Sequence, residues 1–196
     1  MMALDRLKTQ LHPGQVYRRK DLEPWSTAVD RHLKELLDEG VLKKMSPGVY
    51  YCPKLASFGE VPPKEEELVR AFLKSNDFLL TDYNFYNGLG VGTTQLYNHQ
   101  VVYNHKRHGE FKLGGRNFDF RLKHKFPRKL SKEFLVVDLL NHLNELAEDN
   151  EAVLQMVKKK YFSPASTELQ EVINEYAQEK TKTLFRSYSQ RNLVHA

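Results

Sequence analysis

Polar side chains able to contact nucleic-acid bases gather in one short segment near the N-terminus. They lie in the run STAVDRHLKELLDEG at 26–40 and are Ser26, Thr27, Asp30, Arg31 and Lys34. Arginine and lysine donate hydrogen bonds to guanine edges, and hydroxyl and carboxylate groups complement other base edges in the major groove. Such side chains on one face of a helix are therefore candidates for reading a DNA sequence.

Apolar residues in the same run predict the helix that would present these side chains. Val29, Leu33 and Leu36 recur at helical spacing and form one apolar stripe opposite the polar face. Ser26 is a good N-cap, because its hydroxyl can accept hydrogen bonds from the free amides of the first turn. Gly40 stands where a left-handed C-terminal cap belongs. The segment therefore predicts a capped helix with one buried and one exposed face.

Short elements on both sides of this helix complete an N-terminal unit. A leucine pattern predicts a first helix that ends at His12-Pro13-Gly14, and a second, shorter helix is expected at 18–22. Two runs rich in β-formers, at 41–45 and 49–52, flank a Ser-Pro-Gly turn and predict a hairpin. Helix, short helix, longer helix and hairpin is the order of a winged helix-turn-helix, which we place at residues 1–56.

Basic side chains flank the predicted base-reading helix. Residues 1–55 carry a net charge of +3. Arg18, Arg19 and Lys20 fall in the second helix, and Lys43 and Lys44 fall in the hairpin. Because contacts with phosphates release condensed counterions, these five cations are predicted to hold the DNA backbone.

A second basic block lies between residues 99 and 132, which carry a net charge of +8. Its cations include Lys106, Arg107, Lys112, Arg116, Arg121 and Lys123. Between 116 and 123, apolar and polar residues alternate as in a half-buried strand, with Arg121 and Lys123 predicted to face solvent. Such a face could bind a polyanion or an acidic protein, and the simpler alternative is a solubilising surface.

The remaining chain is expected to form a second domain at 63–196. A domain boundary is expected at 54–63, where Gly59 and Pro62-Pro63 interrupt the periodic patterns. Patterns then predict a helix at 64–74, strands at 100–103, 110–113 and 116–123, and helices at 131–146, 150–160 and about 164–185, with frayed last residues. The predicted fold class is α+β: an N-terminal winged helix-turn-helix, a small antiparallel sheet packed on helices, and a helical C-terminal tail.

Four histidines in the second basic block, His99, His105, His108 and His124, raise the question of metal chemistry. Their spacing matches no compact zinc pattern, and Glu110 and Asp119 are the only nearby carboxylates. We therefore expect no catalytic site, no bound metal and no cofactor. A metal-dependent nuclease using His99, His105, His108 and Asp119 is the third of the hypotheses kept open.

Cysteine content and hydropathy limit the remaining classes. The single cysteine, Cys52, excludes an intrachain disulfide and a cysteine-rich zinc site. No apolar run reaches the roughly 18 residues that span a bilayer, and the N-terminus has no signal-peptide core. The sequence predicts a cytoplasmic protein that does not contact membranes.

The run TAVDRHLKELLDEGVLKKMSPGVYYCPK at 27–54 resembles the AbiEi antitoxin family of type IV toxin–antitoxin systems. The shared elements are Ala28-Val29-Asp30, the leucine stripe, Gly40-Val41-Leu42 and Gly48-Val49-Tyr50. The run LGVGTTQ at 89–95, followed by strands and a basic hairpin, is similar to the second domain of that family. The resemblance covers about residues 1–126.

The resemblance implies a bacterial or phage-associated transcriptional autoregulator that is not an enzyme. Its winged helix would bind repeats in the double-stranded DNA of its own promoter, and the second domain would counteract a nucleotidyltransferase-like toxin. The rival hypothesis is a protein-interaction module, in which an acidic partner occupies Lys112, Arg116, Arg121 and Lys123.

Overall fold

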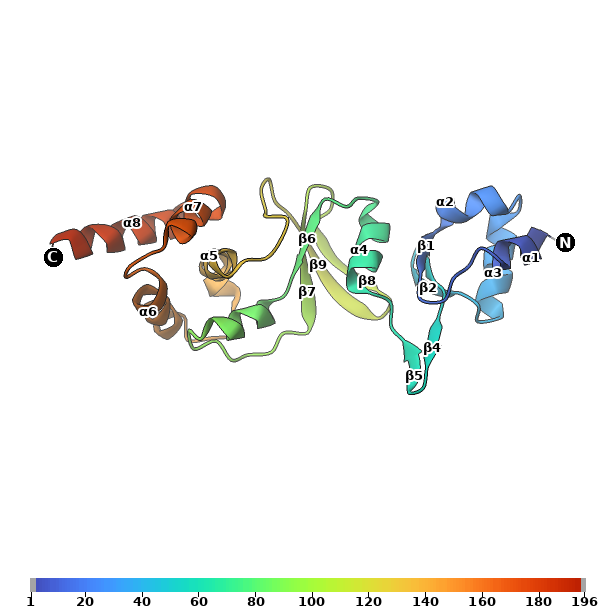
Figure 1. Ribbon diagram of the computed structural model, residues 1–196, viewed down its shortest axis with the longest axis horizontal. Helices are drawn as coiled ribbons and strands as arrows, with labels where there is room; N and C mark the ends of the chain where they lie inside the picture. The colour runs from blue at the N-terminus through green and yellow to red at the C-terminus, as the bar shows by residue number, and fades with distance from the viewer. Residues whose placement is uncertain (1–2, 195–196) are drawn as a thin grey trace. The chain divides into compact units, whose positions relative to one another are not determined.

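The computed structural model describes residues 3–194 and is an α+β protein (Figure 1). Its helices are α1 (Ala3–Lys8), α2 (Arg19–Leu22), α3 (Val29–Asp38), α4 (Glu65–Leu73), α5 (Lys132–His142), α6 (Asn150–Tyr161), α7 (Thr167–Tyr176) and α8 (Glu179–Val194). Its strands are β1 (Val16–Arg18), β2 (Lys43–Ser46), β3 (Val49–Tyr51), β4 (Lys54–Ala56), β5 (Gly59–Val61), β6 (Phe78–Thr81), β7 (His99–Asn104), β8 (Gly109–Leu113) and β9 (Arg116–Leu122). Short 3-10 helices are η1 (Glu23–Trp25), η2 (Tyr83–Leu89) and η3 (Leu143–Glu145).

The chain forms two compact units. The first consists of the residues up to 77 together with 106–119, and the second consists of 78–105 and the residues from 120 onward. The sequence boundary expected near residue 56 therefore falls inside the first unit. Within the described part of the chain, no helix has the length and apolar character needed to span a membrane.

The first unit is built on a three-stranded antiparallel sheet with the order β1-β3-β2. The predicted second and third helices are confirmed as α2 and α3, and the predicted hairpin is confirmed as β2–β3. Strand β1 was not predicted: Val16 pairs with Tyr51 and Arg18 with Val49. The apolar faces of α1, α2 and α3 and the inner side of this sheet share one core, which includes Leu7, Leu22, Leu33, Leu36, Leu42 and Tyr50.

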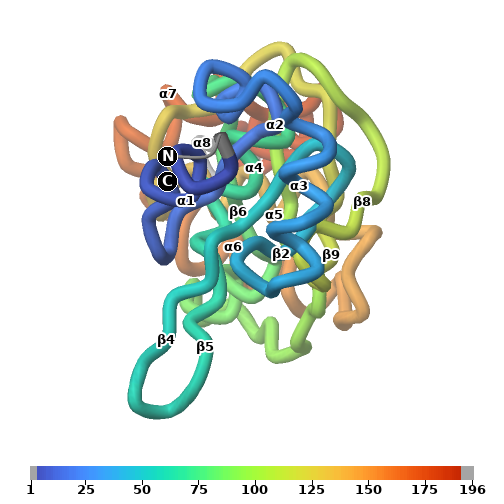
Figure 2. Tube along the Cα trace, turned by 90° about the vertical axis from the view of Figure 1, so that its right-hand side faces the viewer, coloured from blue at the N-terminus to red at the C-terminus, as the bar shows by residue number. Residues whose placement is uncertain are grey.

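The segment 54–63, where a domain boundary was expected, lies inside the first unit and forms a second hairpin. Lys54 pairs with Val61, and Ala56 pairs with Gly59. Figures 1 and 2 both show this β4–β5 hairpin extending away from the three-stranded sheet. Leu55 is 78% exposed and Phe58 is 87% exposed. Because Leu55 and Phe58 are exposed, the sequence lacks the alternation of buried and exposed residues by which a strand is recognised.

A four-stranded sheet has the order β6-β7-β9-β8. The three predicted strands are confirmed as β7, β8 and β9, and the predicted two-residue turn at Gly114-Gly115 has positive φ angles of 56° and 87°. Glycine tolerates such angles without a steric penalty, so these residues fit the turn. Strand β6 was not predicted. It pairs antiparallel with β7 in the second unit.

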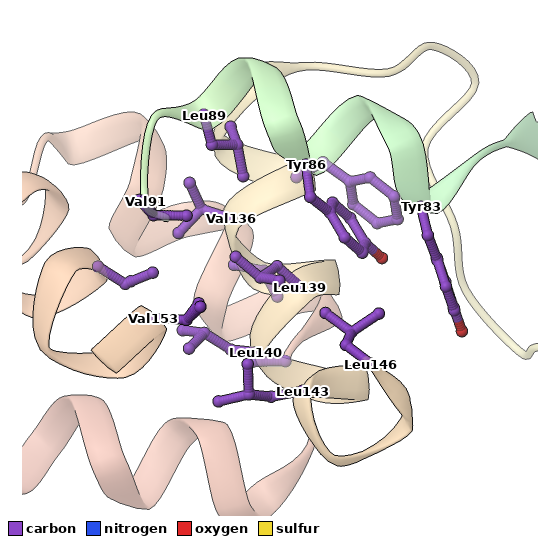
Figure 3. Packing of buried hydrophobic residues seen from close by; sticks show 14 of the residues in the cluster. Tyr83, Tyr86, Leu89, Val91, Val136, Leu139, Leu140, Leu143, Leu146 and Val153 are labelled. Carbon is purple, nitrogen blue, oxygen red and sulfur yellow. The ribbon is translucent and has the colours of Figure 1, made fainter. Parts of the chain in front are cut away.

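Helix α5 forms the centre of the second unit and is covered on nearly every side. Eight of its residues are buried, from Phe134 and Val136 through His142. It packs against η2, α7 and α8. Figure 3 shows Val136, Leu139 and Leu140 of this helix close to Tyr86 of η2 and Val153 of α6. Most residues around its circumference are apolar, as expected for a helix in an interior position, and Asp138, Asn141 and His142 are buried polar exceptions.

The single helix expected at about 164–185 is two helices, α7 and α8, and α8 continues through Val194 where fraying was expected. Buried Asn141 stabilises the break between them. Its Oδ1 accepts hydrogen bonds from the Gln178 amide at 2.9 Å and from the Thr181 hydroxyl at 3.0 Å. Its Nδ2 donates to the Tyr176 carbonyl oxygen at 3.1 Å. The bonds with Gln178 and Tyr176 satisfy backbone groups that the helix ends leave free.

Candidate nucleic-acid interface

Helix α3 has a buried apolar face and an exposed polar face. Val29, Leu33 and Leu36 are buried in the core of the first unit. Arg31 and Lys34 are exposed on the helix, and Thr27 is exposed just before it. The Arg31 side chain is 72% exposed and its Nε lies 3.7 Å from the Glu35 carboxylate. A surface pair of this kind is weak, so Arg31 can exchange Glu35 for a base edge.

Ser26 does not belong to this exposed face. It is buried, its Oγ lies 2.7 Å from Nδ1 of the buried His32, and it accepts a hydrogen bond from the Ala28 amide. Ala28 is the N-cap of α3 and makes no side-chain cap bond, so the predicted cap at Ser26 is wrong. His32 lies next to Leu33 on the inner side of the helix. A histidine at a buried position needs a polar partner, and this was the sequence signal that could have placed Ser26 in the interior.

Asp30 and Arg19, both predicted to contact DNA, bind each other. Arg19 Nε donates to Asp30 Oδ1 at 2.7 Å, and Nη2 donates to Oδ2 at 2.7 Å. Arg19 also pairs with Glu23. The hydrogen bonds from Arg19 hold the pKa of Asp30 below its ordinary value. The Asp30 carboxylate is thus ionised and already bound to Arg19. On helix α3 this leaves Arg31 and Lys34 as the candidates for contacting bases.

The other cations predicted to contact phosphates differ in their surroundings. Arg18 is paired with Asp21, and Lys43 with Glu60 of β5. Lys20 and Lys44 are exposed and form no ion pair with any described residue. Charges without a partner gain most from a phosphate, because no existing contact must be broken.

The second basic block is divided between the two units. Lys106, Arg107, Lys112 and Arg116 belong to the first unit. Lys106 Nζ donates to the Lys74 carbonyl oxygen at 3.1 Å, and Arg116 pairs with Glu65 at 2.8 Å. Lys112 is exposed on β8. Arg121 and Lys123 belong to the second unit.

The prediction that Arg121 and Lys123 face solvent is wrong. Their side chains are only 19% and 23% exposed. Arg121 Nη1 lies 2.8 Å from the Glu145 carboxylate, and Lys123 Nζ lies 4.0 Å from Asp138 Oδ1. Burial lowers the pKa of Lys123, and the charge of Asp138 opposes that effect. The alternating pattern identified the strand, but at its end the exposed side carries Leu122, which is 55% exposed, while Arg121 and Lys123 lie on the covered side.

Asp138 of α5 is the centre of a buried polar cluster that the sequence did not reveal. It is 1% exposed and accepts hydrogen bonds from the Tyr86 hydroxyl at 2.8 Å and the Tyr103 hydroxyl at 2.7 Å. Burial raises the pKa of Asp138, but the contacts from His142, Lys123 and Tyr103 outweigh it and hold the pKa below its ordinary value. The ionised carboxylate thereby connects η2, β7 and α5. A lone aspartate inside an otherwise apolar run was the only sequence signal.

The histidines of the nuclease hypothesis have separate surroundings. His99 meets Tyr83 and Tyr97 edge to face, His105 stacks on Phe126 at 4.7 Å, and His108 is exposed. Within the described residues, no group of three or more His, Cys, Asp and Glu side chains is placed to hold a metal ion. The structure therefore adds no support to a metal centre formed by these histidines and Asp119.

No protein-family model matches the chain, and no curated protein sequence matches it. The function proposed next therefore depends on the geometry of α3 and of the elements around it.

Proposed function

We propose that the N-terminal part of the first unit is a winged helix-turn-helix that binds double-stranded DNA in a sequence-specific manner. The order α1, β1, α2, α3, β2, β3 and the sheet order β1-β3-β2 support this proposal. In such domains the longer helix enters the major groove, while the shorter helix and the hairpin lie along the sugar–phosphate backbone. Helix α3 takes the first of these positions here.

The division of α3 into two faces is the observation that carries the proposal. Its inner face is fixed in the core by Val29, Leu33 and Leu36, so the helix cannot rotate without exposing apolar surface. Its outer face presents Arg31 and Lys34, preceded by Thr27. A rigid helix with exposed donors and an anchored back is what base recognition requires.

Backbone contacts are assigned to Lys20 on α2 and to Lys44 on β2. Arg18, Arg19 and Lys43 reach phosphates only by giving up Asp21, Asp30 and Glu60. We accordingly expect Lys20 and Lys44 to contribute most to affinity and to its salt dependence.

The biological role we propose is that of a cytoplasmic bacterial autoregulator similar to the AbiEi antitoxins. The motifs at 27–54 and 89–95 support it. The second unit would then counteract a nucleotidyltransferase-like toxin. The rival role is an acidic partner held by Lys112, Arg116, Arg121 and Lys123. It loses support because Arg116, Arg121 and Lys123 already face Glu65, Glu145 and Asp138.

The test measures binding of the full chain to the DNA upstream of its own gene and to a scrambled duplex, by fluorescence anisotropy at fixed salt. The variant Thr27→Ala with Lys34→Ala should lose about tenfold or more on the upstream DNA and much less on the scrambled duplex. The control, Thr183→Ala with Lys159→Ala, removes the same groups from exposed positions of the second unit. A wild-type chain that binds both duplexes equally would overturn the proposal.

A further inference from the structure

A cavity of about 660 Å³ opens on the first unit beside the region assigned to DNA. It is lined by the start of α2, the turn between β2 and β3, the end of α4 and the segment around β8. Its volume lies within the range of about 300–1,000 Å³ that small-molecule sites occupy. It is thus large enough for more than a single phosphate group.

The charge that lines this cavity has one sign. Five cationic side chains line it: Arg18, Arg19, Lys20, Lys74 and Arg107. No aspartate or glutamate is among its lining residues. Two of the arginines are held by Asp21 and Asp30, whereas Lys20 and Lys74 form no ion pair with any described residue. The cavity therefore offers at least two uncompensated ammonium groups to an anion.

Flat surfaces line the same cavity. Phe72 and Phe111 have ring centroids 5.0 Å apart at an angle of 57°. The Arg107 guanidinium lies 4.5 Å above the Phe72 ring and 5.9 Å from the Phe111 centroid. Aromatic rings and guanidinium planes are the surfaces on which nucleobases stack, because every base has a π-face.

A neighbouring cavity of about 460 Å³ shows what distinguishes this one. It shares Arg18 and Lys74 but is also lined by Asp21 and Glu67 and by no aromatic side chain. Mixed charge does not select an anion, and without a flat apolar surface there is no support for a base. Only the larger cavity combines ammonium groups with stacking planes.

We propose that the larger cavity binds a nucleoside phosphate, with the phosphate beside Lys20 and Lys74 and the base against Arg107 and Phe111. Two sources share this chemistry: a free nucleotide, and an unpaired nucleotide at the end of a nucleic-acid strand. The proposal goes beyond duplex recognition, since α4 and β8 take no part in the base contacts assigned to α3.

The test titrates the full chain with N-methylanthraniloyl ATP and GTP and, separately, with a fluorescein-labelled oligothymidylate of eight nucleotides. Saturable binding of a labelled mononucleotide identifies the free source. Saturable binding of the oligonucleotide alone identifies a strand end. Absence of saturable binding to all three probes overturns the proposal, and so does displacement of the probe by inorganic phosphate as effectively as by the unlabelled nucleotide.

Two variants test whether the nucleotide probes bind in this cavity. Lys74→Ala should weaken probe binding about tenfold by removing a phosphate contact, and Phe111→Leu should weaken it about fivefold or more by removing a stacking plane. Lys54→Ala, a cation of the same unit outside the cavity, is the matched control. Unchanged probe binding in both Lys74→Ala and Phe111→Leu overturns the proposal. Circular dichroism tests whether each variant is folded. If Lys74→Ala is unfolded, the more conservative Phe111→Leu decides the outcome.

Failure of this proposal and failure of duplex recognition are distinguishable. Lys74→Ala and Phe111→Leu should leave discrimination between the upstream and scrambled duplexes at its wild-type value. The Thr27→Ala, Lys34→Ala variant should in turn bind the labelled nucleotides as the wild type does.

Discussion

Arg19 and Asp30 form a doubly hydrogen-bonded ion pair that ties α2 to the first turn of α3. Both oxygen atoms of the Asp30 carboxylate accept from the guanidinium, each at 2.7 Å. The pair links the two helices and at the same time withdraws one cation and one acid from contact with DNA. The carboxylate also lies near the positive end of the α3 dipole, where negative charge is favourable.

Asp30→Asn should therefore raise DNA affinity without improving specificity. The change removes one of the two carboxylates that hold Arg19, and the guanidinium, then still paired with Glu23, can contact a phosphate. Affinity for upstream and scrambled duplexes should rise alike, and the logarithmic salt slope should become steeper by about one unit. Asp38→Asn, at the other end of α3, is the control. A specific loss on the upstream DNA would instead show that Asp30 accepts from a base.

Arg31→Ala should reduce specific binding by about 1–3 kcal/mol if Arg31 pairs with a guanine, and it should relax the preference at one base pair. The reason is that Arg31 projects from α3 with two long contacts to lose, at 3.7 Å to the Glu35 carboxylate and at 3.4 Å to Nε2 of His32. Affinities for the upstream duplex and for single-base variants of it give the measurement. If the ratio of specific to scrambled binding stays at its wild-type value, Arg31 does not read a base.

Lys43→Ala with Lys44→Ala should weaken binding to every duplex while the ranking of sequences is kept. The expected change in the logarithmic salt slope is up to about two units if both touch phosphates. Lys44→Ala alone should account for most of it, because Lys43 is already paired with Glu60. A wild-type slope in the double variant would place the β2–β3 hairpin away from the backbone.

Asp138→Ala should destabilise the second unit by about 3–5 kcal/mol, because it leaves Lys123 buried without its counter-charge. Asp138→Asn, which preserves the shape, tests the charge itself. Equilibrium unfolding in urea gives the free energy, and faster amide hydrogen exchange in β7 and α5 locates the effect. Glu171→Gln, an exposed acid of α7, should leave both unchanged.

The same residue predicts a pH dependence with a definite sign. The folded-state pKa of Asp138 lies below its ordinary value of about 4, so the folded protein favours the ionised form. Its contribution to stability is complete above that ordinary pKa and is lost as the pH falls through the folded-state value. Wild-type stability should decline over this acidic range, and the decline should be smaller in Asp138→Asn. Equal slopes in both proteins would contradict the assignment.

Arg121→Glu should destabilise the second unit by about 1–3 kcal/mol, since it replaces an attractive contact with Glu145 by a repulsive one in a half-buried position. The reversed pair, Arg121→Glu with Glu145→Arg, should recover part of the loss. A double-mutant cycle in urea measures the coupling. Additive effects of the two substitutions would show that the ion pair contributes nothing.

Several elements followed from local pattern alone. The apolar positions of α3 specify a helix and the side that must be buried, because a helix brings residues three and four apart onto one face. The Gly114-Gly115 turn and the alternation after it specified β8 and β9 in the same way. The α+β class and the exposed Arg31 and Lys34 were thus readable from the sequence.

Long-range pairing decided the rest. Val16–Arg18 is a strand because β3 supplies its hydrogen-bond partners, and the hydroxyl of buried Ser26 lies against His32, six residues further along the chain. The alternation of β9 predicted which side chains share a face, but could not show that α5 brings Asp138 to Lys123 across that face. A periodic pattern records how a chain turns locally, whereas the partner of a buried charge depends on which distant element packs against it.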